Sequence, residues 1–261
     1  MLSNHQRNFV KIFSNLARYH HRYEVFRDFI EMASISLENS ILKSPEKEDK
    51  YFSIAKRYEK HDMNEFPKLL SELVLGLEEQ PSDFLGGLFM ELDLGSKDFG
   101  QFFTPYSLSL LMAKVNVGEL TAELARKPFV TLSEPTCGGG GMIIAFYQAM
   151  LDEGYNPQTQ LHVTCVDLDA TAARMCYVQC SLLGIPCEVY IGNTLTMEMR
   201  SSMKTPAHYL GFWDAKLKRS YDILEENKAG IVVEPVVTPD VITAPAALVA
   251  PSVLEGQLGL F

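Results

Sequence analysis

Residues 129–141 read Phe-Val-Thr-Leu-Ser-Glu-Pro-Thr-Cys-Gly-Gly-Gly-Gly, a short apolar run that leads into four consecutive glycines. The apolar run, Phe129–Leu132, has the length and composition of a buried strand. Helical spacing of apolar residues follows from Met142 to Leu151, so the glycines lie between a strand and a helix. Such a loop turns sharply and lets a ligand approach the free N–H groups of the helix. The stretch therefore predicts the first turn of an α/β ligand-binding sheet.

The same alternation of strand and helix continues along the chain. We expect a strand over 161–166, a helix over 171–183 and a third strand over 187–191. Parallel strands joined by crossover helices form a doubly wound sheet, which binds ligands beyond the carboxyl ends of its strands. Asp167 ends the second strand, where a carboxylate can accept hydrogen bonds from ribose, whereas Asp169 is better placed to cap the next helix. No Lys-Ser/Thr pair follows the glycines, which disfavours a phosphate-gripping loop for nucleoside triphosphates.

The chain divides into three parts of different composition. Residues 1–98 show apolar residues at helical spacing and predict an all-α N-terminal domain, with a charged solvated loop at 44–50. Residues 99–228 carry the strand and helix alternation and predict a cofactor-binding domain. Residues 229–261 have recurrent prolines and no Lys or Arg, which favours an extended, flexible tail. Edge strands packed on the core are the alternative for this last part.

The composition is that of a globular protein of the cytoplasm. The 261 residues are 47% hydrophobic and 21% charged, which excludes wholesale disorder. The five cysteines include no Cys-x-x-Cys pair, so reduced, buried thiols are expected rather than metal ligands. The sequence offers neither a signal peptide nor an apolar run of about 18 residues that could form a membrane helix. The formal net charge of −10 disfavours a mainly electrostatic nucleic-acid binder but allows DNA as a transient substrate.

Four segments in a fixed order resemble the motifs of a known enzyme family. The family is that of the adenine-specific N6 DNA methyltransferases, of the kind found as modification subunits of type I restriction–modification systems. The resemblance covers roughly residues 80–200 and depends on the order and spacing of the segments rather than on any one of them. The segments are Gly100–Pro105 (Gly-Gln-Phe-Phe-Thr-Pro), Glu134–Gly141 (with Glu in place of the usual Asp), Val166-Asp167 and Ile191–Leu195 (Ile-Gly-Asn-Thr-Leu).

The resemblance implies a fold, a ligand and a binding site. The fold would be a Rossmann-like S-adenosylmethionine-dependent methyltransferase core preceded by an all-α domain. The methionine part of S-adenosylmethionine would lie near the glycine loop and the Phe-Phe-Thr-Pro segment, the ribose near the acidic strand end, and the adenine near the third strand. The cofactor-binding residues so implied are Phe102, Phe103, Thr104, Pro105, Glu134, Gly138, Gly139, Gly140, Asp167 and Asn193.

The sequence departs from the family at the catalytic motif. The Asn/Asp-Pro-Pro-aromatic tetrapeptide, with which the family holds a flipped adenine and orients its amino group, is absent. Thr205, Pro206 and Tyr209 stand in roughly its place along the chain and are the only catalytic candidates. The residues before them, 197–204, do not form an apolar fourth strand. Either a second subunit completes the domain and its active site, or the core is a truncated cofactor-binding half.

The pentapeptide Gln257-Leu258-Gly259-Leu260-Phe261 resembles a second known motif. Bacterial replication and repair proteins dock on the β sliding clamp through a similar pentapeptide, with Ser or Asp in place of the glycine. Leu258, Leu260 and Phe261 would fill apolar pockets of the clamp while Gln257 forms hydrogen bonds. The alternative is a terminal apolar patch that folds onto its own domain.

These observations leave three functions open. The first is an S-adenosylmethionine-dependent adenine-N6 DNA methyltransferase that the replication clamp recruits. The second is a catalytically inactive, methyltransferase-like binding or adaptor protein, because the adenine-holding tetrapeptide is missing. The third is an acidic DNA mimic that blocks restriction enzymes, which the charge allows but which leaves the glycine loop without a role. The sequence favours the family and disfavours unaided catalysis.

Overall fold

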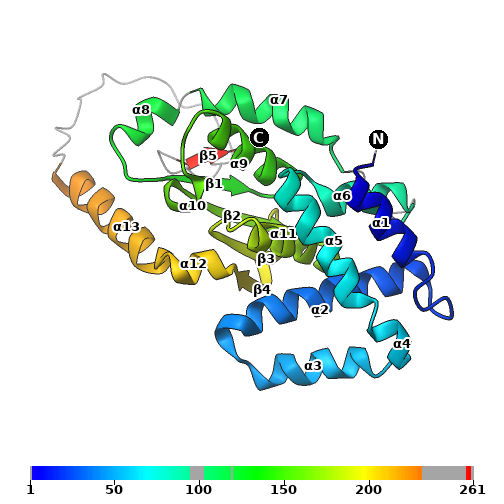
Figure 1. Ribbon diagram of the computed structural model, residues 1–261. Coiled ribbons are helices and arrows are strands. Elements are labelled where there is room, and N and C mark those ends of the chain that lie inside the picture. The colour runs from blue at the N-terminus through cyan, green and yellow to red at the C-terminus, as the bar shows by residue number, and fades with distance from the viewer. Residues whose placement is uncertain (1, 95–102, 119, 231–256, 260–261) are drawn as a thin grey trace, which may run out of the picture.

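A mixed sheet organises the chain, in the computed structural model that describes residues 2–94, 103–118, 120–230 and 257–259 (Figure 1). The strand order is β4-β3-β2-β1-β5. Strands β1, β2 and β3 are parallel to one another, and β4 runs antiparallel to β3. Strand β5 lies parallel to β1, on the side of β1 that faces away from β2. The strands are β1 (Val130–Glu134), β2 (Leu161–Asp167), β3 (Cys187–Asn193), β4 (Glu198–Lys204) and β5 (Gln257–Gly259). The α/β fold class expected from the sequence is confirmed.

The two faces of the sheet differ in polarity. Leu132, Val163 and Cys187 are register neighbours, and all three are buried on the face that packs against the crossover helices. The next register row, Ser133, Thr164 and Glu188, points to the opposite face and is only partly buried. An alternation of this kind is expected when one face of a sheet is covered more completely than the other.

Helices cover the apolar face in two layers. The crossover helices are α9 (Gly141–Asp152), which is followed by the short α10 (Pro157–Gln160), and α11 (Ala170–Leu182). Before the sheet come α7 (Tyr106–Val117), which packs on α9, and α8 (Leu120–Leu124). The helices that follow the β3–β4 hairpin, α12 (Pro206–Leu210) and α13 (Trp213–Gly230), lie instead on the other face. None of the helices in the described part of the chain has the length and apolar character that a membrane crossing requires.

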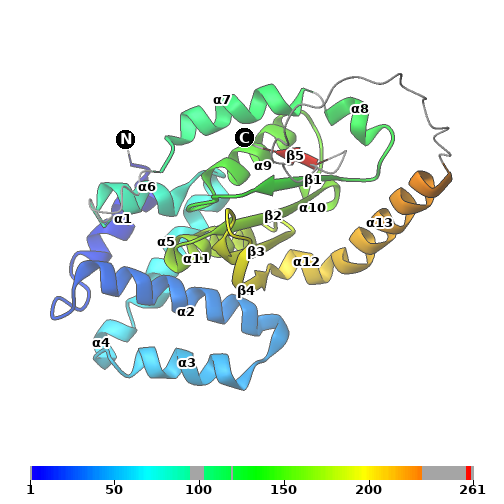
Figure 2. The ribbon, with the colours of Figure 1, turned by 180° about the vertical axis from the view of Figure 1, so that it is seen from behind.

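The N-terminal segment is helical, as predicted. It packs against α11 through α2, α5 and α6, so α11 lies between this segment and the sheet, and the buried apolar side chains of both parts form one continuous cluster. In Figures 1 and 2, α2 and α3 lie at the end of the molecule opposite α7. The helices are α1 (Asn4–Phe13), α2 (Arg22–Leu42), α3 (Pro45–Ala55), α4 (Lys60–Met63), α5 (Phe66–Glu79) and α6 (Phe84–Glu91).

The expected loop at 44–50 is wrong, because these residues begin helix α3. Ser44 is the N-cap, and its side chain accepts a hydrogen bond from the backbone N–H of Lys47. Pro45 occupies the first helical position, and Glu46 and Glu48 lie in the first turn, where negative charge is favourable. The charged residues therefore form a helix start rather than a solvated break.

Two strands lie where the sequence predicted none. Residues 198–204 form β4, a mostly exposed polar strand paired only with β3, so they are an edge hairpin and not a central fourth strand. Residues 257–259 form β5, in which Gln257, Leu258 and Gly259 are in register with Thr131, Leu132 and Ser133. The free tail expected for this part is thus replaced, at these three residues, by the edge-strand alternative. The remainder of the predicted tail, 231–256 and 260–261, lies outside the described residues.

A buried histidine pair attaches α12 and α13 to the polar face of the sheet. His162 of β2 and His208 of α12 lie 3.0 Å apart between Nε2 and Nδ1. The Nε2 atom of His208 lies 3.1 Å from Oδ1 of Asp214, and that carboxylate also pairs with Lys204. Trp213 packs against His162 from the same side. Burial lowers the pKa of His162 to about 3 and also lowers the pKa of His208.

Acidification is therefore expected to destabilise the fold through this pair. Both histidines have a lowered pKa in the folded protein and become charged when unfolded below about pH 6.5, so their contribution to stability is complete above that pH and is lost as the pH falls. For His162 the loss extends toward pH 3. Each can cost up to about 1.4 kcal/mol per pH unit in this window. Urea unfolding at pH 7.5 and pH 5.5 should show a smaller loss of stability for His162→Gln than for the wild type. The exposed His61, changed to Gln, is the matched control, and an equal loss in all three proteins would contradict the prediction.

Candidate functional site

One cavity lies at the carboxyl ends of β1 and β2, where a doubly wound sheet binds its ligands. Its volume is about 310 Å³. It is bounded by the glycine loop between β1 and α9 and by residues of α7, α11 and the N-cap of α6. Of the residues that the resemblance implies, it brings together Phe103, Thr104, Gly138, Gly139 and Asp167.

The glycine loop needs glycine at two positions. Gly138 has φ +53° and Gly140 has φ +94°, which side chains rarely adopt. A Cβ at Gly138 would lie 2.8 Å from the ring of Phe103, and one at Gly140 would lie 3.0 Å from Sγ of Cys176. The loop is thereby pressed against α11, and the N-terminal end of α9 faces the cavity.

Asp167 connects the end of β2 to the glycine loop. Its Oδ2 accepts a 2.7 Å hydrogen bond from the N–H of Gly138, and its Oδ1 accepts a 2.8 Å bond from the N–H of Asp169. Burial raises the pKa of Asp167. Asp169 caps α11 by accepting a 2.7 Å bond from the N–H of Ala172, so the predicted cap is confirmed. Each carboxylate oxygen of Asp167 keeps a second lone pair for a ligand.

Two other implied residues shape the surrounding loops and do not line the cavity. Glu134 is buried at the end of β1, where its Oε1 accepts a 3.1 Å bond from the N–H of Thr136, and burial raises its pKa. Asn193 ends β3, and its Oδ1 accepts bonds of 2.9 and 3.3 Å from the N–H groups of Leu195 and Thr196. Pro105 and Gly140 lie beside the cavity without lining it, and Phe102 lies outside the described residues.

The structure does not bring Thr205, Pro206 and Tyr209 to the cavity. Thr205 is fully buried beside the first residue of β3, Cys187, at the end of the sheet opposite the cavity. Its Oγ1 donates a 2.8 Å bond to the carbonyl of Ile185 and accepts a 3.0 Å bond from the N–H of Cys187. Its hydroxyl therefore holds the start of α12 against the sheet, and Pro206 and Tyr209 belong to that helix. These residues are thus not placed to hold an adenine near the glycine loop.

Sequence reasoning missed two polar residues that line the cavity, Asp83 and Ser109. Asp83 is the N-cap of α6, where its Oδ1 accepts a 2.9 Å bond from the N–H of Gly86. Its position beside the glycine loop depends on the packing of α6 against α11, which no local pattern reveals. Ser109 lies on the buried side of α7 and has no signal of its own in the sequence.

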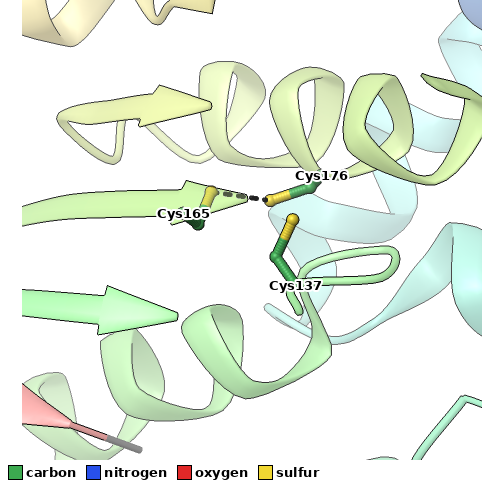
Figure 3. A group of neighbouring side chains, drawn as sticks. All are labelled: Cys137, Cys165 and Cys176. Atoms are coloured by element: carbon green, nitrogen blue, oxygen red, sulfur yellow. Dashed lines mark hydrogen bonds between the residues drawn. The ribbon is translucent and has the colours of Figure 1, made fainter. Parts of the chain in front are cut away.

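Three cysteines meet beneath the glycine loop, as Figure 3 shows. Cys137 comes from the loop, Cys165 from β2 and Cys176 from α11, and their sulfur atoms lie within 4.8 Å of one another. All three are buried free thiols. Two more buried thiols adjoin the group, because Sγ of Cys187 lies 3.6 Å from Sγ of Cys165 and Sγ of Cys180 lies 3.9 Å from Sγ of Cys176. The five thiols together fill the space below the loop.

Comparison with known proteins gives one family and distant structural neighbours. The family model of N-6 DNA methylases matches residues 91–211. No curated protein matches the chain. Among solved structures, one described as a class I S-adenosylmethionine-dependent methyltransferase from Listeria monocytogenes is similar, with 18% sequence identity and a TM-score of 0.40. The match covers 73% of this chain and 54% of that chain.

A second structure is the type I restriction–modification system methyltransferase subunit from Streptococcus thermophilus, with 13% identity and a TM-score of 0.38. The match covers 74% of this chain and 58% of that one. The chain thus spans little more than half the length of either neighbour. Residues 91–211, which include the glycine loop and Asp167, are thus similar to the family of N-6 DNA methylases.

Proposed function

We propose that the chain binds S-adenosylmethionine in the cavity on the glycine loop and takes part in the N6-methylation of adenine in DNA in the cytoplasm. The observation that carries the proposal is the lining of this cavity. It combines the glycine loop with two carboxylates, and none of its described lining residues is Lys, Arg or His. Such a lining disfavours nucleotide phosphates and suits a ligand that carries positive charge.

The residues of the cavity have distinct roles in this proposal. S-adenosylmethionine, when bound, supplies an activated methyl group on a sulfonium. Asp167 accepts hydrogen bonds from the ribose hydroxyls through its remaining lone pairs. Phe103 and Thr104 close the cavity from the side of α7 and orient the methionine part against the glycine loop. Asn193, at the end of β3, marks the side on which the adenine would lie.

A second subunit is proposed to supply the loop that holds the target adenine. The tetrapeptide for this task is absent from the sequence, and among the described residues only the three of β5 pair with the outer edge of β1. Beside the core, α7 exposes an apolar stripe of Leu108, Leu111 and Val115, which are 46%, 62% and 72% exposed. Contiguous exposed apolar residues on one helix face are typical of a protein interface.

Binding of the cofactor is the first test. Calorimetric titration of the wild type with S-adenosylmethionine should give a dissociation constant in the micromolar range, and Asp167→Ala should weaken it about 10- to 100-fold, because hydrogen bonds to a charged group are lost. The surface variant Asp152→Ala is the matched control and should bind as the wild type does. Failure of the wild type to bind S-adenosylmethionine would overturn the proposed function.

Methyl transfer is the second test. The chain alone, given labelled S-adenosylmethionine and unmethylated DNA, should incorporate no methyl groups, because its sequence lacks the Asn/Asp-Pro-Pro-aromatic tetrapeptide that orients the adenine amino group. Incorporation should begin when a partner subunit with the Asn/Asp-Pro-Pro-aromatic loop is added. Cofactor binding without transfer under either condition would instead favour an adaptor role.

We propose recruitment by the β sliding clamp as a second function, from the resemblance of the pentapeptide 257–261 alone, and binding to the clamp would require Gln257, Leu258 and Gly259 to leave their pairing with β1. Deletion of residues 257–261 should abolish binding to the purified clamp, measured by fluorescence anisotropy, because the apolar anchors and the glutamine are removed together. The deletion removes only a three-residue strand from the described fold, so thermal unfolding should change little. Unchanged affinity for the clamp after the deletion would rule this function out.

A further inference from the structure

We infer that Asp83 and Ser109 form a subsite for the α-amino-acid end of a ligand, in which the carboxylate of Asp83 binds an ammonium group and the hydroxyl of Ser109 donates to a carboxylate. The inference rests on the proposed function and extends it, because it assigns the methionine end of S-adenosylmethionine to residues outside the glycine loop. Both residues line the cavity that also contains Asp167.

The carboxylate of Asp83 is held in place through one of its two oxygens. Oδ1 accepts a 2.9 Å bond from the N–H of Gly86 and a 3.0 Å bond from Nε2 of Gln179. No donor in the described part of the chain reaches Oδ2. The residue is only 9% exposed, and its remaining exposure is toward the cavity. One oxygen is therefore fixed and the other is available to a ligand.

Two glycines make room for this carboxylate. A Cβ at Gly86 would lie within 2.1 Å of Oδ2 of Asp83, and one at Gly141 would lie 2.9 Å from the same atom. A residue larger than glycine at position 86 or at position 141 would thus push the carboxylate of Asp83 away from its position. The absence of a side chain at Gly86 and Gly141 therefore leaves space for the carboxylate of Asp83.

The charge of Asp83 has no counter-charge among the described residues. Its hydrogen-bond donors are a backbone amide and a neutral side-chain amide, and burial raises its pKa. A buried carboxylate is costly unless a cation pairs with it. Asp167 adds a second carboxylate to the same cavity. A ligand ammonium would supply the missing positive charge, whereas a phosphate would add to the repulsion.

Ser109 supplies an independent sign that a ligand belongs here. Its side chain is 0% exposed to solvent, and its Oγ has no hydrogen-bond partner, although it lines the cavity. A buried hydroxyl without a partner loses its hydration energy and gains no hydrogen bond in exchange. An α-amino acid carries an ammonium and a carboxylate on one carbon, so it offers a cation to the Asp83 carboxylate and a hydrogen-bond acceptor to the Ser109 hydroxyl.

Two ligands that differ only in the amino-acid end test this subsite. S-adenosylhomocysteine and 5′-methylthioadenosine share the adenosine and the neutral thioether, but only the first has the ammonium and the carboxylate. Asp83→Asn should weaken binding of S-adenosylhomocysteine and of S-adenosylmethionine about 10- to 100-fold, the usual effect of losing a charged hydrogen bond. Binding of 5′-methylthioadenosine should stay within about twofold. Ser109→Ala should have a smaller effect of the same pattern, and Asp152→Asn is the surface control.

The outcomes separate this inference from the function on which it rests. The Asn side chain keeps an oxygen for Gly86 and Gln179, so an unchanged affinity for 5′-methylthioadenosine would show that the variant is folded. An equal loss for both ligands would mean that Asp83 only shapes the glycine loop and would overturn the subsite. Unchanged binding of both ligands would overturn it as well. Failure of the wild type to bind any of the three ligands would overturn the proposed function itself.

Discussion

The buried amide of Gln179 joins three parts of the chain at one point, and the geometry of the cavity depends on it. From its position on α11, Nε2 donates a 2.7 Å bond to the carbonyl of Gly139 and a 3.0 Å bond to Asp83, while Oε1 accepts a 2.9 Å bond from the N–H of Leu85. The N-terminal helices, the crossover helix and the glycine loop therefore share one fixed arrangement. Because the amide is fully buried, loss of any of these bonds would leave a polar group unsatisfied.

The parts of the fold that carry their own periodicity could be predicted from the sequence. The strands β1, β2 and β3 and the helices α9 and α11 lie close to their expected positions, because their apolar spacing records which side is buried. Asp169 could be identified as a cap from its place before a helix. In the candidate site, the positions of the glycine loop and of Asp167 could be predicted because each lies at the end of a strand that the apolar pattern identifies.

The parts that depend on a distant partner could not be predicted. The strand β4 is polar and carries no strand pattern of its own, so its conformation depends on hydrogen bonds to β3. The strand β5 has only three described residues, and its conformation likewise depends on backbone pairing with β1. The position of Asp83 beside the glycine loop depends on its hydrogen bond with Gln179, which lies 96 residues away along the chain. Thr205 was misplaced for a related reason, because its order along the chain matches the family motif while its fold position does not.

The pairing of β5 with β1 has a consequence for the order in which the protein is made. Thr131 and its register partner Gln257 are separated by 257 − 131 = 126 residues. At roughly 5 to 20 residues per second, a ribosome needs on the order of ten seconds to synthesise the intervening chain. Within that interval β2 and β3 are made and become available on the inner side of β1, and a further 257 − 193 = 64 residues separate the end of β3 from Gln257, the partner on the outer edge. A strand from another polypeptide that is present at that time would reach this edge before the chain's own strand does.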